Sequence, residues 1–121
     1  MGGDRWRSRL YLDRGDLLLA LGDEDAAFVE YRATIKSDVR KEVLDHCWPI
    51  YAARGKENDI NEVCKEAYPK CKTEEARQLL LEGFYRYTTM PHKVAYEWAN
   101  PADVVLPPSP PPKLFHMLIS R

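Results

Sequence analysis

The chain has 121 residues and a mass of 14.0 kDa, the size of one domain whose core needs no disulfide or metal to be stable. Its 18 basic and 19 acidic side chains leave a net charge of −1, whereas a general nucleic-acid binder usually carries a basic excess. The longest uninterrupted apolar run covers only residues 17–21, far short of the roughly 18 residues that a membrane helix needs. We therefore expect a globular protein without a membrane span.

The three cysteines are Cys47, Cys64 and Cys71, an odd number with no C-x-x-C pair. This pattern argues against a disulfide framework and favours an intracellular, reducing compartment, in the cytosol or an organelle interior. A metal site would add His46 to the thiols. Small buried core residues are the more common role for such cysteines, so we expect no bound metal.

The first 100 residues are rich in helix formers, and no run of alternating β-branched residues indicates a sheet. The predicted fold is therefore all-α. In chain order the predicted helices are Arg7–Leu21, Glu24–Lys36, Val39–Arg54, Asp59–Tyr68, Glu74–Tyr87 and a short helix from Pro91 to Asn100.

The ends of these helices have recognisable signals. Gly22 and Gly55 are expected to stop the first and third helices, and Pro49 to kink the third. The predicted N-caps are Asp23, Ser37 or Asp38, Asn58 and Thr73. The predicted buried faces are Leu10, Arg14, Leu17, Leu18 and Leu21 in the first helix, Ala27, Tyr31 and Ile35 in the second, and Ile60, Val63, Cys64 and Ala67 in the fourth.

The helices come in pairs that repeat with a step of 33 residues, which carries Gly22 to Gly55 and Tyr31 to Cys64. A period near 34 with two helices per unit is typical of tetratricopeptide (TPR) repeats. The first unit resembles that family in the pattern Tyr11-x3-Gly15-x2-Leu18-x3-Gly22-x4-Ala27-x3-Tyr31-x2-Thr34.

The resemblance covers about 90 of the 121 residues and weakens along the chain. The second unit has Trp48 where the family prefers glycine and Ile60 where it prefers alanine, and the third has Thr88 in place of its glycine. The resemblance implies a short array of about two and a half helical hairpins over residues 1–100. The alternative is an unrelated helical bundle, because apolar stripes of helical period are usually just core.

In the TPR family the first helices of successive units line a concave groove that binds partners. Of the twelve corresponding positions here, five are acidic and two are arginines. Leu12 and Asp16 fill two positions of the family's carboxylate clamp, which is therefore expected to be absent. An acidic groove favours a basic partner segment, although such charges can also be a solvated helix face. The predicted partner-binding residues of the groove are Asp16, Glu42, Asp45, Glu75, Glu82 and Tyr85.

Residues 101–121 are predicted to be a separate tail. Six of the nine prolines fall in residues 101–112, which indicates a stiff extended spacer. The spacer could also serve as a polyproline-domain ligand or a proline-directed phosphorylation site at Ser109. The end of the tail is apolar, and we expect Leu114, Phe115 and Leu118 to dock on the chain's own helices or on a partner.

No catalytic or cofactor-binding motif is present, and the three histidines lie in different segments. We therefore expect no enzymatic activity, no cofactor and no small-molecule substrate. The predicted function is protein–protein interaction, as a small accessory or structural subunit of a larger assembly. The alternatives are a free-standing adaptor for a basic peptide and a nucleic-acid-associated protein that uses Trp6 and the arginines around it, Arg5, Arg7, Arg9 and Arg14.

Overall fold

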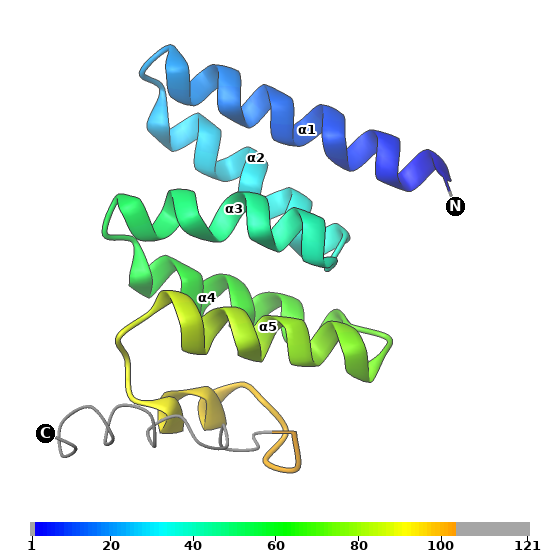
Figure 1. Cartoon of the computed structure of the whole chain (residues 1–121), viewed down its shortest axis with the longest axis vertical. Helices are drawn as coiled ribbons and strands as arrows, with labels where there is room; N and C mark the ends of the chain where they lie inside the picture. The colour runs from blue at the N-terminus through cyan, green and yellow to red at the C-terminus, as the bar shows by residue number, and fades with distance from the viewer. Residues whose placement is uncertain (1, 104–121) are drawn as a thin grey trace, which may run out of the picture.

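The computed structural model describes residues 2–103, with side chains from residue 6 onward. Within this range the chain is all-helical and has no strand, as the sequence predicts (Figure 1). The elements are α1 (Gly2–Ala20), α2 (Glu24–Ser37), α3 (Lys41–Ala53), α4 (Glu57–Ala67), η1 (Tyr68–Lys70), α5 (Glu74–Tyr87) and η2 (His92–Glu97).

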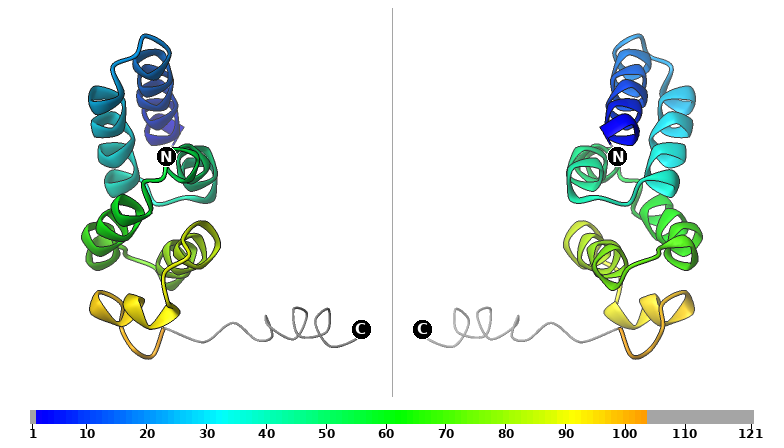
Figure 2. Two further views of the ribbon diagram at one scale, coloured as in Figure 1. Left: turned by 90° about the vertical axis from the view of Figure 1, so that its left-hand side faces the viewer. Right: turned by 90° about the vertical axis from the view of Figure 1, so that its right-hand side faces the viewer.

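The helices stack in the order of the chain, each turning back on the one before it. Figure 2 shows α1, α3 and α5 along one side of the stack and α2, α4 and η2 along the other. Helix α1 packs chiefly on α2, while α3 packs on both α4 and α5. One outer side of α1 therefore forms the N-terminal end of the stack (Figure 1).

The turns explain where most helices begin and end. Gly22 and Gly55 have φ angles of +90° and +70°, a left-handed conformation that residues with a side chain rarely adopt. The predicted N-caps Asp23 and Thr73 are confirmed, because each side chain accepts a hydrogen bond from the backbone N–H three residues later, at 3.3 and 3.1 Å.

Two predicted N-caps are wrong. Helix α3 begins after Arg40, and the carboxylate of Asp38 instead accepts hydrogen bonds from Arg40 and from the Ser8 hydroxyl. Helix α4 begins after Lys56, which places Asn58 inside its first turn. Neither helix has a side-chain cap, and the cap pattern alone misplaced the start of each helix by two residues.

The core runs continuously between the helices, and the buried faces predicted for the second and fourth helices are confirmed. Two glycines allow helices to approach closely. A Cβ atom on Gly15 of α1 would lie 2.6 Å from the ring of Tyr31, and one on Gly83 of α5 would lie 2.2 Å from Nε1 of Trp48. These positions therefore exclude any side chain in the present packing.

The predicted buried face of α1 is largely wrong. Leu10, Leu17 and Leu21 are exposed, and the side that packs on the other helices carries the small or moderate residues Ser8, Leu12 and Gly15. The error arises because α1 has apolar residues on two opposite sides. The stripe of leucines is the longer of the two and predicts the core face. In the structure the opposite side packs on the other helices, because Gly15 lets them approach closely.

The last predicted helix is present but is a 3₁₀-helix, η2, in which Ala95 is buried. The chain after it returns to the helical stack. Asp103 accepts hydrogen bonds from the Tyr68 hydroxyl and from Nε of Arg77, the latter at 3.0 Å, and its carbonyl accepts one from Gln78. Residues 101–103 are thus attached to α5.

Candidate functional site

Two adjoining hollows run along the seam between α3 and α5. The smaller has a volume of about 70 Å³ and the larger about 290 Å³, and both are lined by Lys41 and Leu79. We call the two together the α3–α5 groove. Its lining residues are Val39, Arg40, Lys41, Glu42, Leu44, Asp45 and Trp48 from α3 and the turn before it, and Thr73, Glu75, Ala76, Leu79, Glu82, Gly83, Arg86 and Tyr87 from α5 and its N-cap.

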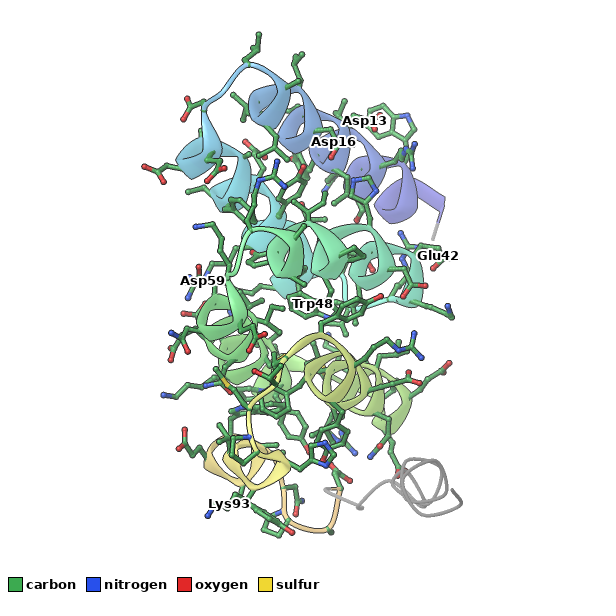
Figure 3. All side chains as sticks on the ribbon, turned by 60° about the vertical axis from the view of Figure 1, so that its left-hand side comes forward. Asp13, Asp16, Glu42, Trp48, Asp59 and Lys93 are labelled. Atoms are coloured by element: carbon green, nitrogen blue, oxygen red, sulfur yellow. The ribbon has the colours of Figure 1, made fainter. Side chains whose placement is uncertain are left out.

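The floor of the α3–α5 groove is apolar. Leu44 and Trp48 are buried, and Leu79 is partly buried beside them. Trp48 lies between α3 and α5, where the missing side chain of Gly83 leaves room for its indole ring (Figure 3). The Trp48 N–H is buried and has no hydrogen-bond partner among the described residues. Because Leu44 and Trp48 are almost completely covered, the apolar surface that a bound segment could contact comes from the partly exposed Val39, Ala76, Leu79 and Tyr87.

The rims of the groove carry four acidic and three basic side chains. Asp45 pairs with Lys41 at 2.6 Å, and Glu82 lies 3.9 Å from Arg86. Each pair joins neighbouring turns of one helix and is exposed, so each is a weak, screened interaction.

Two further rim acids differ in their partners. Glu42 pairs with Arg40 at 3.2 Å. Glu75 is exposed and forms no ion pair within residues 6–103. The predicted acidic surface is thus a mixed-charge surface with a small acidic excess.

Four of the predicted partner-binding residues are therefore brought together by the structure: Glu42 and Asp45 on α3, and Glu75 and Glu82 on α5. Sequence reasoning missed the apolar floor, because it noted Trp48 only as a departure from the TPR pattern and did not single out Leu79. The available signal was the pairing of a bulky Trp48 with a helical Gly83, which would have indicated a close contact between these two helices.

Asp16 lies on α1, away from the α3–α5 groove (Figure 3). Its Oδ1 accepts a hydrogen bond from the Tyr31 hydroxyl at 2.6 Å and lies 2.9 Å from Nε2 of His46. Burial raises the pKa of Tyr31, and the hydrogen bond to Asp16 raises it further. Asp16 therefore links α1 to α2 and α3.

The remaining predicted residues are elsewhere. Tyr85 packs on Phe84 and on the ring of His92, toward η2, and its buried hydroxyl has no partner in the described part of the chain. Leu12 is part of the core. Leu114, Phe115 and Leu118 lie outside the described residues.

The chemistry available to the cysteines is limited by burial. Burial raises the pKa of both Cys47 and Cys64, so these thiols stay protonated at neutral pH. Residues 6–103 contain no group of three or more histidine, cysteine or acidic side chains that could hold a metal ion. None of the helices between residues 2 and 103 is long and apolar enough to cross a bilayer.

No family model, curated protein or solved structure matches the chain.

Proposed function

We propose that this chain is a protein–protein interaction module, a small non-catalytic accessory subunit of a larger assembly built as a TPR-like array of about two and a half helical hairpins. The observation that carries this proposal is the α3–α5 groove, with its apolar floor and charged rims. Such a groove offers burial for apolar side chains and orientation by charge, the two components that peptide-binding grooves combine.

The 33-residue step supports the TPR-like array within this proposal. It relates Tyr51 on α3 to Phe84 on α5, both of them buried aromatic residues, and Gly22 to Gly55, the two glycines that adopt positive φ at equivalent turns. The arrangement of α1, α3 and α5 along one side of the stack agrees with a repeated hairpin (Figure 2). In this proposal the tail residues Leu114, Phe115 and Leu118 dock on the partner and form a second contact.

A second candidate, a free-standing adaptor for a basic segment, is favoured by one specific observation. Glu75 is exposed at the N-terminal end of α5 and pairs with no cation within the described chain. A lysine or arginine of a bound segment would supply that cation, and apolar residues next to it in the segment would contact Leu79. The two proposed roles, accessory subunit and adaptor, would therefore use the same binding surface. They would differ in whether a partner occupies that surface permanently or transiently.

The test is charge reversal on the rim with a matched control. Partners are first identified by affinity purification and mass spectrometry, and their binding is then measured by titration. The triple variant E42K/D45K/E82K should weaken binding, and the wild-type affinity should fall with added salt, because charges at an exposed rim are screened within about 10 Å at 0.1 M salt.

The control variant D25K/E62K/E97K changes the net charge equally at exposed positions outside the α3–α5 groove. It should bind like the wild type. Both variants should keep the helical circular-dichroism spectrum, since the altered side chains are not in the core. Equal loss of binding in both variants would mean that only net charge matters, and the groove would not be the binding surface.

A further inference from the structure

Helix α1 carries a second apolar face on the side opposite the core. Four large apolar side chains are exposed there: Trp6 by 67%, Leu10 by 43%, Leu17 by 60% and, directly after the last residue of α1, Leu21 by 72%. The Leu21 N–H still donates a helical hydrogen bond to the Leu17 carbonyl. At 100° per residue they fall within an arc of about 60°, and the buried Ser8, Leu12 and Gly15 lie across the helix axis. We call these four residues the outer stripe. Scattered single exposures need no explanation, but four large apolar side chains aligned on one side of a helix indicate an interface.

The equivalent side of α3 is already an interface within the chain. Residues 33 positions after Leu10 and Leu17 are Val43 and Ile50 on α3; Val43 is buried in the core and the partly buried Ile50 packs against it. His46, one turn after Val43, contacts Asp16 of α1, so this side of α3 faces α1. In α3 this face is covered by α1 and α2, whereas nothing within residues 2–103 covers it in α1.

The charges beside the outer stripe indicate what covers it. Asp13 and Arg14 lie at its midpoint, on opposite flanks, each about 50° from its centre. If two such helices pair in parallel around a two-fold axis, the Asp13 flank of each meets the Arg14 flank of the other. An antiparallel pair would instead bring Asp13 to Asp13 and Arg14 to Arg14.

We propose that the outer stripe is the contact surface for a second copy of this chain, paired in parallel along α1. Each copy places Leu10 and Leu17 against the same residues of the other, and the two Asp13–Arg14 pairs flank this centre. Such a contact is isologous and closed, so it gives a dimer and not a filament. It uses no residue of the α3–α5 groove and is independent of the function proposed above.

Asp13 and Arg14 remain available for contacts with a second copy, although each has an ion-pair partner within the chain. Asp13 lies 3.4 Å from Arg9 and Arg14 lies 3.1 Å from Glu30, and three of these four side chains are more than half exposed. Exposed pairs of this kind contribute little to stability and exchange readily. The stripe has four residues, far fewer than the roughly 20–30 residues that each partner contributes to a standard interface, so we expect a weak dimer with a micromolar dissociation constant.

The first experiment measures the mass of the full chain by sedimentation equilibrium over a range of protein concentrations. The wild type should show a monomer–dimer equilibrium. Leu17→Glu should raise its dissociation constant by about 30-fold or more, as expected when a central interface residue is lost. Val29→Glu is the matched control, because Val29 is 66% exposed but lies on α2, so this variant should dimerise normally. Circular dichroism verifies that both variants are folded.

The second experiment tests orientation. The single variants D13R and R14D should each weaken the dimer, and the double variant D13R/R14D should restore it, because only a parallel pair regains both opposite-charge contacts. In a background with the partly exposed Cys71 changed to serine, W6C and L21C should each form a disulfide-linked dimer with itself.

Three results would overturn the proposal. A wild type that stays monomeric at all concentrations would assign the outer stripe to a different protein. Dimerisation unaffected by Leu17→Glu would place the contact elsewhere. A mixture in which W6C links mainly to L21C would show an antiparallel pair.

Discussion

The contact between Trp48 and Gly83 makes a sharp prediction about stability. A Cβ atom on Gly83 would lie 2.2 Å from Nε1 and 2.6 Å from Cδ1 of Trp48, well inside van der Waals contact. The indole is 99% buried between α3 and α5 and cannot swing aside into solvent. Gly83→Ala must therefore displace the ring or separate the two helices.

The magnitude follows from two opposing contributions. Overpacking a buried site costs roughly 1–3 kcal/mol, and the short distance places this site near the upper value. Alanine in a helix interior is more favourable than glycine by about 1 kcal/mol. We expect a net loss of about 2 kcal/mol, and at roughly 4 °C for each kcal/mol in a chain of this size, thermal denaturation should shift down by about 8 °C.

Thermal and urea denaturation followed by circular dichroism measure this loss, and a second variant separates its causes. In the Trp48→Leu background the indole is absent, so adding Gly83→Ala should cause no loss and should recover part of the stability through helix propensity and cavity filling. A single Gly83→Ala variant that melts at or above the wild-type temperature would refute the close contact of α3 and α5.

Three further predictions concern other parts of the chain. Ala27→Leu should cost roughly 1–3 kcal/mol of stability because Ala27 is fully buried. Gly22→Val should also destabilise the fold because Gly22 has positive φ. Unchanged melting temperatures of both variants would contradict the helix register. Arg32 lowers the pKa of Glu66 to about 2, so this ion pair should stabilise the fold above about pH 4.5 and lose its effect toward pH 2. Glu66→Gln should cost about 1 kcal/mol or less of stability at pH 7, since both side chains are partly exposed. This cost should vanish at pH 2. Deleting residues 113–121 should abolish partner capture and leave the melting temperature unchanged, whereas a lower melting temperature would show that the tail docks on the chain's own helices.

The helices could be predicted from the sequence because their signals are local. Glycines after the first and third helices, and oxygen-bearing side chains before the second and fifth, act within one turn of the backbone. The starts of α3 and α4 could not be predicted in this way. Asp38 is used by Ser8, which is 30 residues away in sequence, and no local pattern reports such a partner.

The site was predictable only in part for a similar reason. The TPR resemblance placed Glu42, Asp45, Glu75 and Glu82, together with Arg86, on one surface, but it could not show that Arg40 and Lys41 share that surface. Whether a charged side chain forms an ion pair depends on the rotamers of neighbouring side chains, and helical periodicity carries no information on rotamers. Periodicity also could not decide between the two apolar sides of α1, since both have helical spacing and only the position of Gly15 against Tyr31 selects the inner one.

Pairing of two copies would have a consequence for partner binding. The outer stripe and the α3–α5 groove share no residue, so a dimer would present two unobstructed grooves on one particle. Two linked sites convert the second binding event into an intramolecular one, which can raise overall avidity by about 10²–10⁴ without a new contact. Leu17→Glu should therefore leave the affinity for a single partner segment unchanged in titration, but weaken retention on a surface densely coated with that segment. The reversal E42K/D45K/E82K should weaken both, because it changes the groove itself.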